Sequence, residues 1–231
     1  MESKIFCIPY AGGSASVYRK MQLYSMPGVS IIPVELAGRG TRMKEAFYNH
    51  FQEAVDDVTE HILKSCSNGE PVNILGYSMG SLIAYEVTTK LEKTMEVNNL
   101  IVSSNAAPSI EAKIPKIYEY SDEKLFTVLQ ELGNIEQTIF EDERFWNIYS
   151  RIIRADFKLL YQYRLIPHYD KVKANISVFV GNNDKCFNNI KAWRNNTEGQ
   201  CIFKVNNGGH FSMLENLETF TNDICSIVLE K

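Results

Sequence analysis

No stretch of this sequence approaches the roughly 20 consecutive apolar residues that a membrane-spanning helix needs. Its first residues contain no charged segment followed by an apolar one, which is the pattern of a secretory leader. Lysine and arginine form no block, and the formal net charge is -4. These absences argue against a transmembrane protein, an exported protein and a broad nucleic-acid-binding surface. We therefore expect a soluble protein that binds neither membrane nor nucleic acid.

The five cysteines lack the C-x-x-C spacing of zinc and redox sites, and their odd number argues against a framework of disulfides. They are Cys7, Cys66, Cys186, Cys201 and Cys225. Cys7 and Cys225 lie in apolar runs, where a thiol behaves as a small buried hydrophobic side chain. We expect no metal or redox cofactor, and the reducing cytoplasm as the location.

Phosphate-binding loops are missing as well, because neither G-x-x-x-x-G-K nor G-x-G-x-x-G occurs. The chain also has no internal repeats and no low-complexity linker. Its 231 residues, 45% of them hydrophobic, fit one α/β domain with a large core. We expect a single domain over residues 1–231.

What the sequence does contain is an alternation of short apolar runs and longer amphipathic segments. This order is typical of a parallel sheet covered by helices. Strands are expected at residues 5–9, 30–35, 72–76, 100–104, 176–180 and 201–205. Helices are expected at residues 16–24, 51–65, 79–93 and 217–229. The predicted fold class is α/β, with a mostly parallel central sheet of about six to seven strands flanked by helices.

Residues from about 110 to 167 interrupt this alternation, because they show no convincing strand. Two helical patterns occur there, at residues 122–132 and 142–163, and the second is rich in aromatics. One interpretation is a helical subdomain whose aromatic side chains pack into a small core of their own. The other is a lid over a functional site at that edge of the sheet, with some aromatics lining a channel for a substrate. Both can hold, because a helical piece inserted between two strands must lie across one edge of the sheet.

A G-x-S-x-G pattern at residues 76–80 lies between a strand-like run and a helix-like run. This context is typical of the nucleophile elbow, in which a serine occupies a tight turn from strand to helix. The glycines are needed because side chains beside the serine would collide where the backbone doubles back. The pattern alone is weak, since chance would supply it in roughly one chain of this length in ten. With its context, it makes Ser78 the candidate nucleophile.

A serine nucleophile needs a base within hydrogen-bonding distance, itself oriented by a carboxylate. In the α/β-hydrolase order the acid and then the histidine follow the serine, each on a loop after a strand. The chain has four histidines, His50, His61, His168 and His210. Only His210 follows an expected strand, through the glycine-rich loop at 206–209, and precedes the last helix. We expect His210 to be the general base.

The acid should follow the strand expected at residues 176–180, and Asp184 occupies that loop. An alternative role for Asp184 is to form a turn that caps the next helix. Asp170 precedes the strand and Asp156 lies within a helical pattern, so both fit worse. The loop after the earlier strand, at residues 103–105, offers no carboxylate. Asp184 is therefore the expected acid.

Attack on a carbonyl creates an oxyanion, which needs fixed N–H donors that are typically worth about 3–4 kcal/mol each. One expected donor is the amide of Met79, which follows the serine and begins a helix, where the helix dipole also favours negative charge. The other is expected at Ala11, in the loop after the first strand. The alternative for residues 9–14 is a glycine-rich turn with no catalytic role.

At this point the chain resembles the type II thioesterases that accompany nonribosomal peptide and polyketide assembly lines. The residues that carry the resemblance run from one end to the other, at 6–15, 34–42, 76–80, 132–133, 154–157, 181–184 and 208–211. The F-x-x-P-x-A-G-G and L-x-G-R-G-x-R blocks are far more specific than G-x-S-x-G. Their order and spacing also agree with the family.

The resemblance implies an α/β-hydrolase with a helical lid, acting on acyl or aminoacyl groups that are thioester-linked to the phosphopantetheine arm of carrier proteins. Such enzymes need no cofactor, remove aberrant or stalled acyl groups and are mostly monomers. The resemblance also implies a triad of Ser78, Asp184 and His210. Ala11 and Met79 would supply the oxyanion donors.

The chain departs from the family pattern at two places. Tyr77 replaces the histidine usual before the serine, and Ala37 stands where proline is common. Neither touches the chemistry, although Tyr77 can alter how the elbow packs. Arg39 and Arg42 are expected to be structural or to contribute to a docking surface. A charged pair within residues 154–156 is expected to tie the lid to the body.

Two other functions remain open at this stage. A stand-alone carboxylesterase or lipase would use the same triad, since a triad does not discriminate esters from thioesters. A protein of a different class, a non-catalytic ligand-binding protein on the same scaffold, is the other alternative. The presence of all three triad residues argues against that class.

Overall fold

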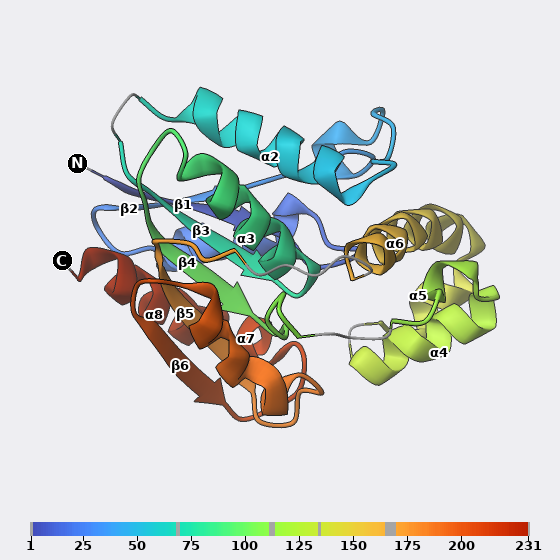
Figure 1. Cartoon of the computed structure of the whole chain (residues 1–231). Coiled ribbons are helices and arrows are strands. Elements are labelled where there is room, and N and C mark those ends of the chain that lie inside the picture. Colours follow the sequence, from blue (N-terminus) through green and yellow to red (C-terminus); the bar gives the residue numbers. More distant parts are fainter. Residues whose placement is uncertain (1, 68–69, 111–113, 134, 165–169, 231) are drawn as a thin grey trace.

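A single sheet of six strands forms the centre of the computed structural model, which describes residues 2–67, 70–110, 114–133, 135–164 and 170–230. The strand order is β2-β1-β3-β4-β5-β6, and every neighbouring pair is parallel (Figure 1). The strands are β1 (Ser3–Ile8), β2 (Val29–Pro33), β3 (Val72–Tyr77), β4 (Val97–Ser103), β5 (Asn175–Gly181) and β6 (Cys201–Asn206). The α/β class predicted from the sequence is confirmed, with six strands.

Helices cover both faces of the sheet (Figure 1). On one face lie α2 (Phe51–Ser65) and α3 (Met79–Leu91), and on the other lie α1 (Met21–Tyr24), α7 (Ser212–Glu215) and α8 (Leu217–Leu229). Alternate residues of β1 enter opposite cores: Phe6 and Ile8 pack on the α2/α3 side, and Ile5 and Cys7 on the α8 side. Because both faces are buried, residues 5–8 of the strand form a continuous apolar run.

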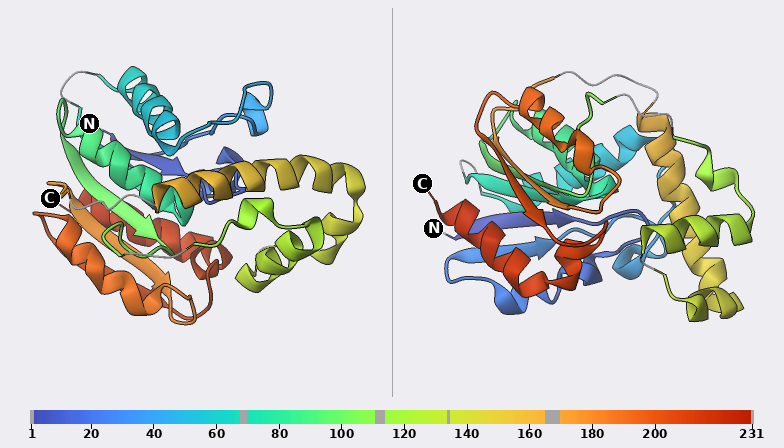
Figure 2. Two further views of the ribbon diagram at one scale, coloured as in Figure 1. Left: turned by 45° about the vertical axis from the view of Figure 1, so that its right-hand side comes forward. Right: turned by 90° about the horizontal axis from the view of Figure 1, so that it is seen from below.

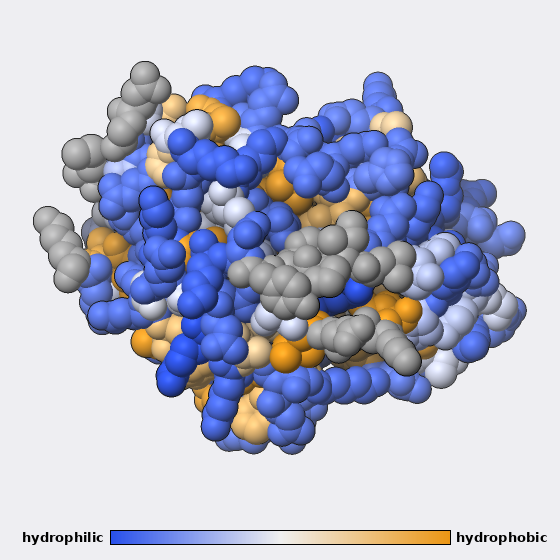
Figure 3. Space-filling view, in the orientation of Figure 1, coloured by the Kyte–Doolittle hydropathy of each residue, from blue (hydrophilic) through white to orange (hydrophobic). Residues whose placement is uncertain are grey.

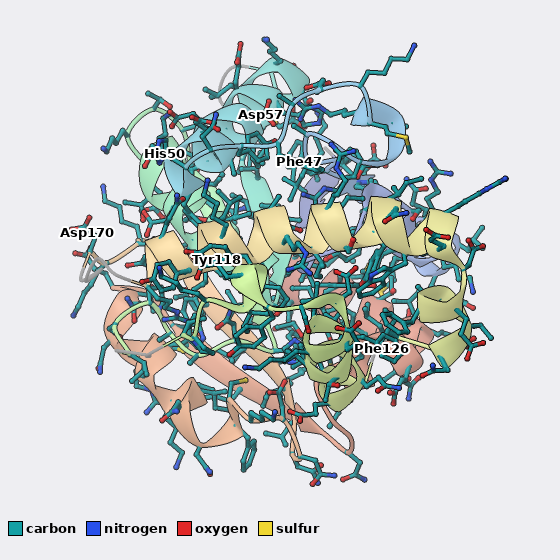
Figure 4. All side chains as sticks on the ribbon, turned by 90° about the vertical axis from the view of Figure 1, so that its right-hand side faces the viewer. Phe47, His50, Asp57, Tyr118, Phe126 and Asp170 are labelled. Carbon is teal, nitrogen blue, oxygen red and sulfur yellow. The ribbon has the colours of Figure 1, made fainter. Side chains whose placement is uncertain are left out.

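The chain between β4 and β5 forms the helical segment, which comprises the described residues from 114 to 164. Its elements are the 3-10 turn η3 (Ile117–Glu119), α4 (Asp122–Leu132), α5 (Gln137–Glu141) and α6 (Glu143–Tyr163). The segment lies beyond the carboxyl ends of the strands, and α6 is its longest element (Figure 2). Seen from that side, α6 crosses the molecule, with Tyr118 and Phe126 beneath it (Figure 4).

Part of the aromatic content of this segment packs within the segment itself. Phe126 of α4 stacks on Phe140 of α5 with ring centroids 4.5 Å apart, and Phe140 meets Trp146 of α6 edge-on at 5.0 Å. Edge-to-face and offset contacts of this kind add to the area that the rings bury. The helical segment therefore has a small core of its own, as one of the two interpretations expected.

Residues 16–24 do not form the single helix expected from the sequence. They divide into the 3-10 turn η1 (Ala15–Tyr18) and the four-residue helix α1. The Tyr18 hydroxyl is buried and donates to the carbonyl of Ile8 in the sheet at 2.8 Å. This hydrogen bond ties the segment to the sheet. The helix propensity of these residues is modest, so the tertiary contact prevails over a single continuous helix.

Other features also go beyond the sequence pattern. Helix α5 and the 3-10 helix η4 (Phe187–Asn196) were not expected, and α3 ends at Leu91 rather than at residue 93. All five cysteines are free thiols, with Cys7 and Cys225 fully buried as expected. Within the described parts of the chain, no helix has the length and apolar character that a bilayer span requires.

Candidate active site

Ser78 stands alone between the last residue of β3 and the first residue of α3. Its backbone has φ 51° and ψ -114°, a conformation that costs a non-glycine residue about 1–3 kcal/mol. The glycines of the motif make the turn possible. A Cβ at Gly76 would lie 2.2 Å from the carbonyl oxygen of Gly80, and one at Gly80 would lie 2.3 Å from that of Ile8. The serine hydroxyl is thus held on a strained turn at the carboxyl edge of the sheet.

Two further loops bring a histidine and a carboxylate to this serine. Asp184 follows β5 and His210 follows β6. Nε2 of His210 lies 3.0 Å from Oγ of Ser78, and Nδ1 lies 2.9 Å from Oδ2 of Asp184. In the tautomer with a proton on Nδ1, the ring donates to the carboxylate, and Nε2 accepts from the serine hydroxyl. The structure therefore brings together the three residues that the sequence pattern selected.

The Asp184 carboxylate is buried, with 7% of the residue exposed. Burial by itself would raise its pKa, but the hydrogen bond and the charge of His210 outweigh burial and hold the pKa below the ordinary value. Its other oxygen, Oδ1, accepts the backbone N–H of Cys186 at 3.0 Å. One oxygen thus contacts the histidine and the other closes a local turn, but Asp184 does not cap the following helix η4, whose N-cap residue is Cys186.

The other described histidines, and the two carboxylates considered as alternatives to Asp184, have other surroundings in the structure. His50 precedes α2 and His61 lies on it, and both are exposed. His168 lies outside the described residues. Asp170 is exposed before β5, and Figure 4 shows it at the periphery together with His50. Asp156 is fully buried on α6, where it pairs with an arginine instead of a histidine.

Two hydroxyl groups hold the backbone of His210 in place. The Tyr77 hydroxyl donates to the His210 carbonyl at 2.7 Å, and the Ser104 hydroxyl donates to the same oxygen at 2.8 Å. Burial raises the pKa of Tyr77, so its phenol stays protonated and able to donate. Ser104 has φ 54°, a left-handed value that is uncommon for a residue other than glycine. The sequence pattern pointed to residues 103–105 only as a possible source of a carboxylate, and it gives no sign of this contact.

The two expected oxyanion donors follow two neighbouring strands, β1 and β3. Met79 is the first residue of α3, and Ala11 lines the cavity that also contains Ser78. Among the described residues, neither backbone amide has a hydrogen-bond acceptor. The strands β1 and β3 are parallel neighbours, and the order in which successive strands are added reverses between them, so the loops that follow both strands open at the same carboxyl edge. Both N–H groups are thus available to a negatively charged oxygen.

Asn105 is a second residue that the sequence did not indicate, and it holds the backbone of the turn at Ser78. The side-chain amide of Asn105 donates to the carbonyl of Ser78 at 2.7 Å. Its own carbonyl oxygen Oδ1 accepts from Nη2 of Arg164 at 3.0 Å. Burial lowers the pKa of Arg164, which also donates to the backbone carbonyls of Ala107 and Ile110. Arg164 thereby fixes the loop after β4 on which Asn105 lies.

A cavity of about 590 Å³ opens at Ser78 and His210, which is within the usual range for small-molecule sites. Its walls are mostly apolar, and the helical segment contributes Leu129 of α4 and Tyr149 and Phe157 of α6 to them. On the face shown in Figure 3 the surface is mostly hydrophilic, and apolar patches show between the sheet and the helical segment. Aromatics of this segment therefore line the cavity as well as packing among themselves.

Comparisons with known proteins show the family to which the chain belongs. A family model described as "Thioesterase domain" matches residues 3–228. The chain belongs to the thioesterase domain family. It is therefore a hydrolase that acts on thioesters, as the sequence predicted.

Curated relatives of this thioesterase span nearly its whole length. It is 28% identical over 228 residues to the gramicidin S biosynthesis protein GrsT of Aneurinibacillus migulanus, covering 96% of this chain and 87% of that protein. It is 27% identical over 217 residues to the medium-chain S-acyl fatty acid synthase thioesterase of Homo sapiens, covering 92% and 81%.

Solved structures resemble the thioesterase over the same extent. The type II thioesterase BorB from the borrelidin biosynthetic cluster superposes with a TM-score of 0.87 at 26% identity, covering 99% of this chain and 93% of BorB. ClbQ from the colibactin pathway superposes with a TM-score of 0.90, covering 100% and 98%. Its 23% identity supports the shared fold alone.

The charged residues that the sequence analysis singled out have clear partners in the thioesterase. Arg39 is 2% exposed and pairs with Asp156 across the boundary between the body and the helical segment. Arg39 is therefore a structural residue, and the alternative expectation that it contributes to a docking surface is wrong. Arg42 is half-buried and donates to Asp57 at 2.6 Å. Arg154 binds within the helical segment, where it donates to the carboxylate of Asp122. Asp156, and not Arg154, links that segment to the body.

Proposed function

We propose that this thioesterase removes acyl or aminoacyl groups from the phosphopantetheine arm of carrier proteins, through an acyl-enzyme formed on Ser78. One observation carries the mechanism: the His210 imidazole lies within hydrogen-bonding distance of both the Ser78 hydroxyl and the Asp184 carboxylate. The carrier-protein substrate is supported by the sequence blocks shared with type II thioesterases. It is also supported by relatives whose names connect them to gramicidin S biosynthesis and to a fatty acid synthase.

In the first step the Ser78 oxygen attacks the thioester carbonyl carbon, and the hydroxyl proton passes to Nε2 of His210. The carbonyl electron pair moves to oxygen, where the amides of Ala11 and Met79 stabilise the oxyanion. Collapse of this intermediate breaks the carbon–sulfur bond. The proton on Nε2 is transferred to the departing sulfur, and the carrier thiol is released.

In the second step water replaces the sulfur group. His210 removes a proton from the water as it attacks the acyl-serine, and the same amides hold the second oxyanion. The bond to Oγ then breaks, the proton returns to Ser78, and the free carboxylic acid leaves. Asp184 keeps the ring in the required tautomer and stabilises the imidazolium that forms in both steps.

We further propose that the helical segment acts as a lid over Ser78 and that its apolar wall receives the acyl chain. Burial of methylene groups there would contribute about 0.8 kcal/mol each. The carrier arm would then enter beside His210. A stand-alone carboxylesterase would have the same triad and cavity, so substrate comparison decides between the two.

The deciding experiment measures turnover of one acyl group presented as acyl-carrier protein, acyl-pantetheine and p-nitrophenyl ester. A carrier-specific enzyme should have a higher kcat/KM for the carrier protein than for acyl-pantetheine, because the carrier adds binding energy. Equal kcat/KM on all three would contradict the carrier-protein proposal and favour a general esterase.

Ser78→Ala should fold normally and lose at least about three orders of magnitude in kcat, as removal of a triad nucleophile typically does. Circular dichroism and urea unfolding check the fold, and a fluorophosphonate should label the wild type but not the variant. Turnover near the wild-type rate would overturn the nucleophile assignment. A wild-type protein that neither turns over thioesters nor reacts with the fluorophosphonate would instead indicate a binding protein.

A further inference from the structure

The loop that carries Ala11 is a β-turn of residues 10–13, closed by a hydrogen bond from the Gly13 amide to the Tyr10 carbonyl at 2.9 Å. Gly12, the third residue of the turn, has φ 81°, the sign that a type II turn requires there. Such a turn satisfies the amide of its fourth residue. It leaves the amides of its two central residues, Ala11 and Gly12, without an acceptor inside the turn. What these two amides bind decides what the turn can do.

Helix α6 binds one of them. The Gly12 amide donates to Oδ2 of Asp156 at 2.7 Å. Tyr149 and Ile153 precede Asp156 by seven and three residues, a spacing that places all three on one face of the helix. A Cβ added to Gly12 would lie 2.5 Å from Cδ1 of Ile153 and 2.9 Å from the Tyr149 hydroxyl. This face of α6 is therefore packed directly on the turn.

Arg39 fixes the carboxylate that Gly12 uses. Nη1 and Nη2 of Arg39 donate to Oδ2 and Oδ1 of Asp156, each at 2.6 Å, and the two side chains are 2% and 1% exposed. Nη1 also donates to the Gly13 carbonyl at 3.2 Å. A buried bidentate pair has little freedom to rotate. The Arg39 guanidinium therefore fixes both the Asp156 carboxylate, which accepts the Gly12 N–H, and the Gly13 carbonyl at the end of the turn.

We propose that Asp156 and Arg39 are positioning residues for the oxyanion hole. They anchor the turn to α6 through the Gly12 N–H and the Gly13 carbonyl, and so set the position of the turn relative to Ser78. The Ala11 amide, which belongs to the same turn, is thereby held in place beside Ser78. Because α6 also forms a wall of the cavity, seating of this helix and formation of the oxyanion hole are a single event. The inference rests on the proposed mechanism, in which Ala11 donates to the oxyanion.

Two variants test the proposal by different routes. Asp156→Asn keeps the size of the side chain but replaces one acceptor oxygen with a donor, so the three hydrogen bonds can no longer all form. Gly12→Ala retains the Arg39–Asp156 pair but pushes the turn away from α6. Each should lower kcat roughly ten- to a hundredfold, with KM within about threefold of wild type, because the loss falls on the transition state.

An alkylboronic acid supplies a readout that a merely structural role would not move. The boronic acid adds to the serine oxygen and forms a tetrahedral, negatively charged adduct. A fatty acid product binds without forming a tetrahedral adduct. In both variants the boronic acid should lose affinity by a factor comparable to the loss in kcat. Inhibition by the fatty acid should be unchanged. All rates are normalised to the folded fraction from urea unfolding.

Asp122→Asn is the matched control. Asp122 also pairs with an arginine of α6, Arg154, at 2.6 Å, but neither residue contacts the turn. This variant should retain the wild-type kcat and boronic acid affinity. The proposal is overturned if Asp156→Asn and Gly12→Ala also retain them, or if Asp122→Asn loses as much as they do.

Failure of this inference can be told apart from failure of the proposed function. If Ser78→Ala is inactive while Asp156→Asn and Gly12→Ala behave as wild type, only the positioning role is wrong. If Ser78→Ala keeps wild-type turnover, the acyl-serine mechanism fails, and the positioning role fails with it.

Discussion

The His210 imidazole is fixed at both ring nitrogens, and the backbone carbonyl of the same residue is fixed as well. The ring contacts were accessible from the sequence, because Ser78, Asp184 and His210 each follow a strand in the order that a hydrolase sheet requires. The contacts to the carbonyl, from Tyr77 and Ser104, were not accessible. A hydroxyl that acts on a backbone atom leaves no spacing pattern in a sequence, and only the fold brings it into place.

Tyr77→Phe should lower kcat by roughly tenfold with little change in KM, because small errors in the placement of a catalytic base are costly. The Phe variant keeps the ring that stacks on Phe211 and removes only the hydroxyl. Adding Ser104→Ala should deepen the loss, since the His210 carbonyl then has neither hydroxyl donor. Steady-state kinetics on an acyl-pantetheine measure both effects.

Tyr163→Phe provides the comparison for these variants. It removes the hydroxyl of Tyr163 on α6, which donates to the carboxylate of Glu86 on α3 at 2.7 Å. Neither residue contacts His210 through a hydrogen bond that the structure shows. The kcat of this variant should stay near the wild-type value even if its stability falls. A loss of kcat in Tyr163→Phe equal to that in Tyr77→Phe would show that any buried tyrosine hydroxyl matters and would contradict a specific role for Tyr77.

Helix α6 both packs within the helical segment and lines the cavity, and the sequence pattern predicts the helix without assigning these two roles to its residues. Its periodicity predicted a helix over 142–163, and the structure has one over Glu143–Tyr163. The sequence left open whether its aromatics form a core or line a channel, and both occur: Trp146 packs on α5, while Tyr149 and Phe157 line the cavity. Periodicity gives the apolar face of a helix, but the partner of that face depends on elements distant in the sequence.

Filling the cavity from α4 should shift the preference for acyl length. Val128 lines the cavity, and Val128→Phe should reduce kcat/KM for a long acyl thioester about tenfold or more while sparing an acetyl thioester. The reason is loss of space beyond Ser78, which only the long chain occupies. A series of acyl-pantetheines from two to twelve carbons measures the shift.

Gln130→Phe places the same aromatic on an exposed position of α4. It should leave the acyl-length profile unchanged. If Val128→Phe and Gln130→Phe alter the profile equally, or if Val128→Phe lowers all chain lengths alike, the cavity is not the acyl site.

Ion pairs across the whole molecule predict how stability responds to acid. Hydrogen bonds from Lys90 and Lys4 lower the pKa of Asp56 and of Glu70. For Asp57, burial alone would raise the pKa, but Arg42 and Tyr48 outweigh it and lower the pKa. A carboxylate with a lowered pKa stabilises the fold fully above its unfolded value of about 4. That contribution is lost as the pH falls through the folded value.

The free energy of unfolding should therefore decrease below about pH 4, and Asp57→Asn should make this decrease shallower. We expect the free energy of unfolding of the variant to be lower than that of wild type by about 1 kcal/mol at pH 7. This difference, the stability gap, should narrow toward pH 2. Urea unfolding at pH 7, 4, 3 and 2 measures the gap. Thr59→Val, on the same helix, removes a buried hydroxyl but no titrating group, and its gap should not depend on pH. An Asp57→Asn gap equally independent of pH would contradict the argument.

The two ends of the chain both lie on the side of the sheet away from the helical segment (Figure 1). Strand β1 begins at Ser3 and α8 ends at Leu229, whereas Ser78 lies past the other end of the strands. Six residues of strand span about 20 Å. A carrier domain fused to either terminus would need a flexible glycine–serine tether of more than about 13 residues merely to cover that distance. Tags and surface immobilisation at either end should, for the same reason, leave the entrance to the cavity unobstructed.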